Sequence, residues 1–94
     1  MAEGRFTLSQ TRALDFFPSF DEAWTAAQTV IAGLRERNFS GTRPLATDVA
    51  DEYGLRFRGA GWYLKLTIVT DSVAVISLHP LERPIRTNGG VVKP

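Results

Sequence analysis

The stretch WYLKLTIV, residues 62–69, decides the fold of this 94-residue chain. Large apolar side chains at its even positions alternate with Tyr63, Lys65 and Thr67, and this period of two is typical of a β-strand. We expect the even positions to face a core, and these are Trp62, Leu64, Leu66 and Ile68. The odd positions then point the other way, so the strand predicts a sheet with one covered face and one open face.

Two neighbouring segments extend this strand into a sheet. Residues 55–58, Leu-Arg-Phe-Arg, alternate in the same way, and Gly59-Ala60-Gly61 is a connection of hairpin length. Residues 73–79 form an almost continuous apolar run, and Pro80 ends it because proline has no N–H to donate to a ladder. The three segments predict an antiparallel sheet over about residues 55–79. On the last strand we place Ala74, Ile76 and Leu78 toward the core, and Val75, Ser77 and His79 on the open face.

The segment before the sheet has the pattern of an amphipathic helix. Residues 19–22, Ser-Phe-Asp-Glu, form a capping box, in which Ser19 and Glu22 satisfy each other's backbone amides. Apolar residues then recur every three or four positions, at Phe20, Ala23, Trp24, Ala27, Val30, Ile31 and Leu34. Arg35 and Arg37 would complement the dipole of the last turn. We predict a helix over about residues 20–37, packed on the sheet in a two-layer α+β domain.

The remaining segments are assigned from turn and capping residues. Residues 38–46 read as a loop that Phe39 anchors to the core, and residues 47–54 read as a short helix capped by Thr47 and ending near Gly54. Before the long helix we expect three buried side chains, those of Leu14, Phe16 and Phe17. Residues 80–94 are rich in proline and glycine, and they predict a loop or a short edge hairpin with a turn at Asn88-Gly89-Gly90.

Length and composition limit the classes of protein to which the chain can belong. Ninety-four residues fit one domain, residues 1–94, and are too few for a dinucleotide-binding double domain or a barrel enzyme. The absence of cysteine excludes disulfides and thiolate metal sites, and a single histidine argues against a structural metal. No apolar run approaches the ~18 residues of a membrane span, and the N-terminus does not resemble a signal peptide. We therefore expect a cytoplasmic domain with no cofactor, no metal and no membrane partner.

The net charge of +1 conceals an asymmetry along the chain. Residues 1–55 hold five basic and eight acidic side chains, a balance of −3, whereas residues 56–94 hold six basic and two acidic ones, a balance of +4. A basic C-terminal part is typical of a surface that binds RNA, DNA or an acidic protein. Ordinary solvated surface charge is the alternative interpretation.

The open face of the predicted sheet gathers side chains that suit phosphate chemistry. Its members would be Arg56, Arg58, Tyr63, Lys65 and His79. Guanidinium groups bind phosphate, a tyrosine can stack on a base, and a histidine can move a proton near neutral pH. These are the parts needed to cleave RNA without metal. The alternatives are a histidine that caps a strand end, a structural tyrosine and a solvated row of arginines.

Four short segments resemble the motility quorum-sensing regulator (MqsR) toxin family. Residues 30–39, VIAGLRERNF, are similar to its helix-ending signature, and Asp48-Val49 resembles the Asp-Val before its sheet. Residues 63–68, YLKLTI, and 73–77, VAVIS, resemble its last two core strands. The likeness covers about residues 11–79. It implies a RelE-like fold, a metal-independent endoribonuclease that cuts mRNA, a neutralising antitoxin partner, and Tyr63 as an active-site residue.

The chain departs from that family pattern at two positions. The family's lysine after the loop phenylalanine falls at Gly41, with Arg43 the nearest cation, and its glutamine before Asp-Val falls at Thr47. In related RelE-like toxins the end of the last strand supplies catalytic side chains, which implies roles for His79 and for Arg83 or Arg86.

The residues and the resemblance together predict an mRNA interferase, the toxin of a bacterial type II toxin–antitoxin pair. We assign catalysis to His79, Tyr63 and Lys65. Phosphate binding is assigned to Arg43, Arg56, Arg58, Arg83 and Arg86. The substrate would be mRNA, free or bound to the ribosome. The alternative is a module that binds through the same basic face without chemistry, such as an inhibitor, an immunity-type protein or an RNA-binding protein.

Overall fold

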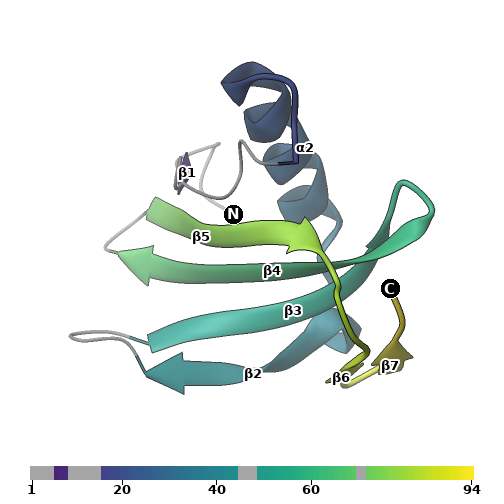
Figure 1. Ribbon diagram of the computed structural model, residues 1–94. Helices are drawn as coiled ribbons and strands as arrows, with labels where there is room; N and C mark the ends of the chain where they lie inside the picture. Colours follow the sequence, from purple (N-terminus) through teal and green to yellow (C-terminus); the bar gives the residue numbers. More distant parts are fainter. Residues whose placement is uncertain (1–5, 9–15, 45–48, 70–71) are drawn as a thin grey trace.

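The computed structural model describes residues 6–8, 16–44, 49–69 and 72–94 (Figure 1). In chain order the elements are β1 (Phe6–Leu8), α2 (Phe20–Gly33), the 3₁₀ turn η1 (Glu36–Asn38), β2 (Phe39–Pro44), β3 (Val49–Phe57), β4 (Ala60–Val69), β5 (Ser72–Pro80), β6 (Ile85–Thr87) and β7 (Gly90–Val92). The main sheet has the order β1-β5-β4-β3-β2, and β6 pairs with β7 in a separate hairpin. Strands β2 to β5 are antiparallel, while β1 runs parallel to β5. The predicted α+β class, with its helix before the antiparallel strands, is confirmed.

Helix α2 begins as the sequence predicts, since Ser19 Oγ accepts a hydrogen bond of 3.2 Å from the Glu22 amide. It ends at Gly33, earlier than the predicted residue 37. Glycine is a poor helix former, and the Arg35 amide donates to Asn38 Oδ1 at 2.8 Å, which closes the separate η1 turn. Arg35 lies beyond the helix, where its guanidinium donates to the Leu34 carbonyl at 2.9 Å.

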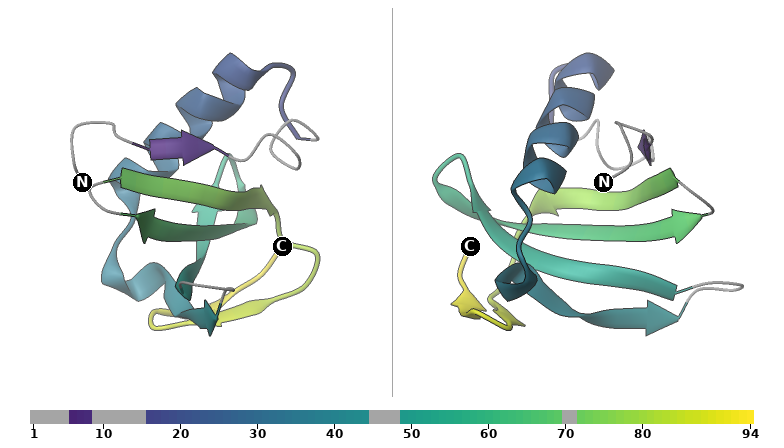
Figure 2. Two further views of the ribbon diagram at one scale, coloured as in Figure 1. Left: turned by 90° about the vertical axis from the view of Figure 1, so that its left-hand side faces the viewer. Right: turned by 180° about the vertical axis from the view of Figure 1, so that it is seen from behind.

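The core lies between α2 and one face of the sheet, and Figure 2 shows the helix crossing that face when the molecule is seen from behind. The helix contributes small and branched side chains, which let it pack closely: Ala23, Ala26, Ala27, Val30 and Ile31. The strands contribute Leu55, Trp62, Leu64, Leu66, Val73, Val75 and Leu78. Phe17 is buried against Trp62, with ring centroids 5.6 Å apart, as expected. Phe16, expected to be buried, is 43% exposed, and Leu14 lies outside the described residues.

A bulge in β5 overturns part of the predicted facing of its side chains. Lys65 pairs with Ser77 but Leu66 pairs with Val75, so Ile76 has no partner and the alternation shifts by one position. Leu78 is buried as predicted, whereas Val75 is buried and Ala74 and Ile76 are only half-buried.

The end of β4 also differs from the predicted alternation. Ile68, predicted to face the core, is 63% exposed because it lies near the end of the strand, where α2 does not cover it. Thr67, predicted for the open face, is buried instead. Its hydroxyl donates to the Val49 carbonyl at 2.7 Å, which satisfies the buried polar group.

The described parts of the segment between helix and sheet, residues 39–44 and 49–54, are extended, where the sequence predicts a loop and a short helix. Thr47, the predicted cap of that helix, lies outside the described residues. Residues 39–44 form β2, and residues 49–57 form β3, which pairs with β2 on one side and with β4 on the other. Ladder hydrogen bonds and the burial of Ala50 and Leu55 outweigh the local capping signals. Phe39 packs edge-on against Tyr53, with ring centroids 5.6 Å apart.

The β3–β4 turn and the C-terminal β6–β7 hairpin are both described by the structure. The β3–β4 connection is Arg58-Gly59, one position earlier than predicted, with φ of 53° and 80°. Positive φ at both positions is the type I′ geometry that matches the twist of a hairpin. The C-terminal segment forms the β6–β7 hairpin, held by the Asn88 amide on the Phe39 carbonyl (2.9 Å) and by Ser40 Oγ on the Arg86 carbonyl (2.7 Å).

The predicted hairpin therefore exists, but it packs across the open face of the sheet instead of extending an edge. A Cβ at Gly54 would lie 2.4 Å from Ile85 Cγ2, and one at Gly61 would lie 2.0 Å from the Lys93 carbonyl oxygen. Only glycine allows the tail to approach these strands so closely.

Candidate functional site

A pocket of about 420 Å³ lies on the open face of the sheet, beside the C-terminal tail. Four adjacent strands contribute polar side chains to it: Ser40 and Arg43 from β2, Glu52 from β3, Tyr63 from β4 and His79 from β5. Strand register brings them together, because Tyr63 pairs directly with His79. Residues 81–85 of the tail form the remaining wall. Charged, aromatic and imidazole groups thus surround one small volume.

Glu52 connects the groups on the β2 side of the pocket. Its Oε2 accepts a short hydrogen bond from the Tyr63 hydroxyl, and its Oε1 accepts one of 3.0 Å from Arg43 Nε. Burial raises the pKa of the Glu52 carboxyl, but the bonds from Tyr63 and Arg43 and the charges of Arg43 and Lys65 outweigh it, so the pKa lies below its usual value. Glu52 is therefore an ionised acceptor that holds both neighbours in place.

Tyr63 is held in its neutral form. Burial raises the pKa of its hydroxyl well above the usual value, and the hydrogen bond to Glu52 and the negative charge of that carboxylate raise it further. A phenol in this state donates a hydrogen bond and does not act as a base. The ring remains half-exposed, so it can contact a ligand in the pocket.

His79 packs beside Tyr63, with ring centroids 5.1 Å apart and planes inclined by 33°. Its Nδ1 lies 2.8 Å from the Pro80 carbonyl oxygen. Because a carbonyl can only accept, Nδ1 carries the proton, and in the neutral ring the lone pair is on Nε2. His79 therefore has one nitrogen fixed by the backbone and the other able to accept a proton.

The structure brings some of the predicted site residues together and leaves others apart. Arg83 lines the pocket with Arg43, Tyr63 and His79. Lys65 lies next to the pocket, because it is paired in register with Glu52.

Three predicted phosphate ligands do not line this pocket. Arg56 donates to the Lys93 and Gly59 carbonyls at 3.2 and 3.1 Å, which holds it at the β3–β4 turn. Arg58 is not on the open face, because its left-handed backbone turns its guanidinium over the Phe57 ring, 4.9 Å from the centroid. Arg86 is exposed on β6, outside the pocket.

The sequence analysis does not identify Glu52, because it predicts a short helix over residues 47–54. The signal was present in the alternation of Glu52, Gly54 and Arg56, which places them on one face of an extended strand. It was masked by the helix-capping appearance of Thr47 and Asp48.

Within residues 6–8, 16–44, 49–69 and 72–94 no three His, Cys, Asp or Glu side chains are grouped so that they could hold a metal ion. No helix in this part of the chain is long and apolar enough to cross a membrane.

Comparison of the chain with family models, curated proteins and solved structures finds no match.

Proposed function

We propose that this chain is a metal-independent endoribonuclease that cleaves mRNA and acts as the toxin of a bacterial type II toxin–antitoxin pair. The observation that carries the proposal is the convergence of His79, Tyr63, Glu52 and Arg43 on one open pocket. An imidazole with a free nitrogen, a stacking ring and cations are the groups that transesterification of RNA requires.

In the proposed reaction the 2′-hydroxyl of RNA supplies the nucleophile. His79 Nε2 takes the proton from that hydroxyl, and the 2′-oxygen attacks the adjacent phosphorus. The bond from phosphorus to the 5′-oxygen breaks, and the leaving oxygen takes a proton from water. The hydroxide formed takes the proton that His79 holds, which restores the neutral imidazole. The products are a 2′,3′-cyclic phosphate and a new 5′-hydroxyl end. DNA lacks the 2′-hydroxyl and would not be cut.

The other residues of the pocket bind and orient the substrate. Arg43 and Arg83 lie where they can contact the phosphate, whose negative charge increases in the transition state. The Tyr63 ring, beside His79, would stack on the base next to the cleaved bond. Glu52 is a positioning residue, since both of its oxygens are used to hold Tyr63 and Arg43. Lys65, opposite Glu52, favours the ionised carboxylate.

The role as a toxin rests on the resemblance of residues 30–39, 48–49, 63–68 and 73–77 to the MqsR family. That resemblance also supports a cytoplasmic location, an mRNA substrate and a cognate antitoxin.

The proposal is tested with purified chain and a labelled mRNA transcript in buffer that contains a chelator. We expect cleavage to 5′-hydroxyl ends, and a loss of about 100-fold or more in His79→Ala, because general base catalysis contributes that much. Glu52→Gln is expected to lose about tenfold through misplacement of Tyr63 and Arg43. Arg83→Ser removes a cation from the pocket and is expected to weaken RNA binding and cleavage. The exposed Arg37→Ser, on the other side of the hairpin, is its matched control and should change neither. Cleavage that survives in His79→Ala, or that needs a metal ion, contradicts the proposal.

The second candidate is a binding module that uses the same pocket without chemistry. It is favoured by the Arg43–Glu52 ion pair, because a carboxylate that neutralises a phosphate ligand weakens the case for anion chemistry. This alternative predicts that the wild-type chain binds RNA or a protein partner and leaves every transcript intact.

A further inference from the structure

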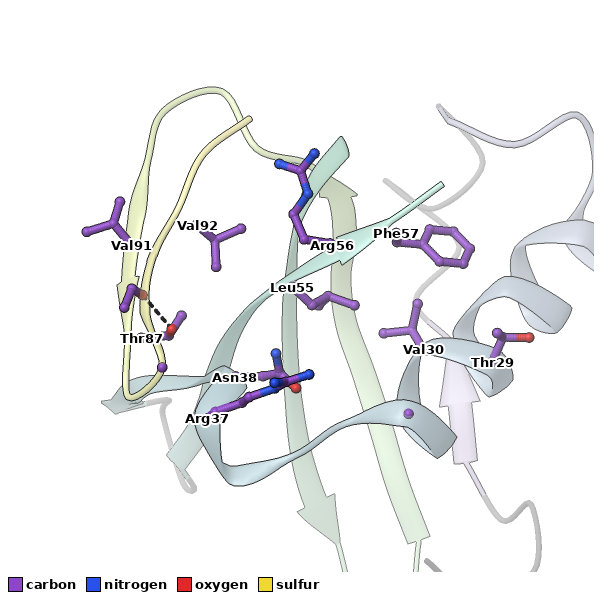
Figure 3. Close-up of a pocket in the computed structure, with 13 residues that line it drawn as sticks. Thr29, Val30, Arg37, Asn38, Leu55, Arg56, Phe57, Thr87, Val91 and Val92 are labelled. Carbon is purple, nitrogen blue, oxygen red and sulfur yellow. Dashed lines mark hydrogen bonds between the residues drawn. The ribbon is translucent and has the colours of Figure 1, made fainter. Parts of the chain in front are cut away.

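A second pocket of about 420 Å³ lies on the other side of the β6–β7 hairpin (Figure 3). It is bounded by the end of α2, by η1 and by the hairpin, and its floor is the end of β3. None of its lining residues belongs to the candidate site. We refer to it as the hairpin groove. Its chemistry is therefore separate from that of the proposed ribonuclease pocket.

The floor of the hairpin groove is a strand edge that no described strand covers. Pairing between β2 and β3 ends at Phe39 and Tyr53, while β3 continues to Phe57 with β4 on its other side. The Gly54 carbonyl points away from β4, because it accepts a bond of 3.3 Å from Asn38 Nδ2. In an antiparallel strand alternate residues send N–H and C=O to the same side. The backbone N–H and C=O of Arg56 therefore also face away from β4, toward the groove.

The walls of the hairpin groove combine apolar side chains with the uncharged polar residues Thr29, Asn38 and Thr87, and its ends are cationic. Figure 3 shows Val30 and Leu55 facing one another in the middle, with Val92 on the hairpin side. Arg37 lies at the η1 end of the groove and Arg56 at the opposite end. No acidic side chain lines the groove, and neither arginine has an ion pair with a described residue.

We propose that the hairpin groove binds an extended acidic peptide segment of a partner protein. The segment adds a short strand to the edge at residues 54–57, as in other cases of β-augmentation. There it bonds to the backbone N–H and C=O of Arg56, while the Gly54 carbonyl keeps its bond from Asn38. One apolar side chain of the segment packs on Leu55 and Val30, and acidic side chains on either side of it pair with Arg37 and Arg56. An unpaired backbone edge, walls with a single aromatic ring, Phe57, and only two cations suit a peptide better than a nucleic acid, which would need several aromatic platforms and a row of cations.

The test uses fluorescence anisotropy with the full chain and a dye-labelled peptide, Asp-Glu-Val-Leu-Glu-Asp. We expect saturable binding, and the double variant Arg37→Ser with Arg56→Ser should raise the Kd by about tenfold or more. Arg83→Ser, which removes a charge outside the groove, should leave the Kd unchanged. Two changes to the peptide should abolish binding. Replacing Val-Leu by Ser-Ser removes the apolar contact, and methylating the central backbone nitrogen removes a hydrogen-bond donor of the added strand.

A second variant removes the space without removing charge. Gly33 lines the groove, and a Cβ there would meet no atom within 4 Å, so the side chain of Gly33→Leu starts in open space and is expected to occupy part of the groove. Gly41→Leu is the matched control, because a Cβ at Gly41 is equally unobstructed and lies outside the groove. We expect Gly33→Leu to block the peptide and Gly41→Leu to bind it normally.

Three results would overturn the proposal. The peptide does not bind, or Gly33→Leu binds it as well as the wild type does, or the Ser-Ser peptide binds equally and so reports surface charge alone. A single-stranded RNA that binds in the groove where the peptide does not would identify a different occupant. His79→Ala should bind the peptide like the wild type, so failure of the ribonuclease proposal and failure of this one are distinguishable.

Discussion

The two faces of the main sheet are covered by different means. On the face behind the sheet in Figure 1, α2 contributes an apolar surface that seals Leu64 and Leu78 completely. On the face toward the viewer, the C-terminal tail, residues 81–94 with the β6–β7 hairpin, covers the end near Gly54 and Gly61 and leaves a pocket beside it. Side-chain packing stabilises the first face, whereas hydrogen bonds and close backbone contacts shape the second. The second face is therefore the one free to carry a binding site.

The largest expected effect compares neighbouring residues that point to opposite faces. Leu64→Ala removes a fully buried side chain and should lower the free energy of unfolding by about 2–5 kcal/mol. Lys65→Ala, on the other face, should change it by less than about 0.5 kcal/mol. Chemical denaturation of both variants checks this. A similar loss of unfolding free energy in the two variants would mean that side-chain packing on the open face stabilises the fold as much as the core does.

The next effect concerns the contact between the tail and the sheet. Gly61→Val places side-chain atoms where the Lys93 carbonyl lies, so the tail must move, and we expect a loss of about 1–3 kcal/mol. Thermal melting gives the loss, and limited proteolysis should show new cleavage within residues 81–94. Gly33→Ala enters open space in a helix and serves as the control, with a stability equal to or up to about 1 kcal/mol above the wild type. Protease resistance of the Gly61→Val tail would count against the packing described here.

A smaller effect is the dependence of stability on pH, which the ionised Glu52 on the open face should produce and the apolar core face should not. The folded state lowers the pKa of Glu52, so this carboxylate stabilises the fold above its unfolded pKa, and the contribution is lost as the pH falls through the folded pKa. The free energy of unfolding, measured by denaturation at several pH values below about 5, should therefore depend less on pH in Glu52→Gln than in the wild type. At neutral pH the variant should be less stable by about 1 kcal/mol, the size of one net hydrogen bond. Parallel pH profiles would mean that Glu52 is not paired in solution.

The smallest effect concerns an arginine that the fold removes from the open face. Arg58→Asn suits the left-handed backbone of the turn but loses the contact with Phe57, so the two changes should cancel to within about 0.5 kcal/mol. RNA binding should be unchanged, in contrast to Arg83→Ser. Weaker RNA binding by Arg58→Asn would contradict this account and would mean that Arg58 contacts RNA.

The elements with strong local periodicity could be predicted from the sequence. Helix α2, strands β4 and β5 and the opposed facing of Leu64 and Tyr63 follow from apolar spacing and a capping box. The end of β3, residues 55–57, is predicted as a strand from its alternation, but its first part, residues 49–54, is predicted as a helix, because pairing with β2 and β4 and not local composition makes that part extended. The bulge at Ile76 had no local signal, since both faces of that run are apolar.

The candidate site was predicted in part for the same reason. Tyr63 and His79 were placed on the open face because strand alternation reports facing. Glu52 is missed with the first part of its strand. Arg56 and Arg58 are predicted in the site because alternation reveals neither the carbonyls that hold Arg56 nor the turn that redirects Arg58. The course of the tail, which makes one wall of the pocket, depends on contacts with Phe39 and Ser40 that are distant in the sequence.

The most direct measurement is induced expression of the chain in bacteria, followed by mapping of mRNA 5′ ends and of growth. The ribonuclease account predicts growth arrest and new 5′-hydroxyl ends for the wild type and for Arg58→Asn, and loss of both in His79→Ala. Normal growth with intact mRNA at good expression of folded wild-type chain would contradict it.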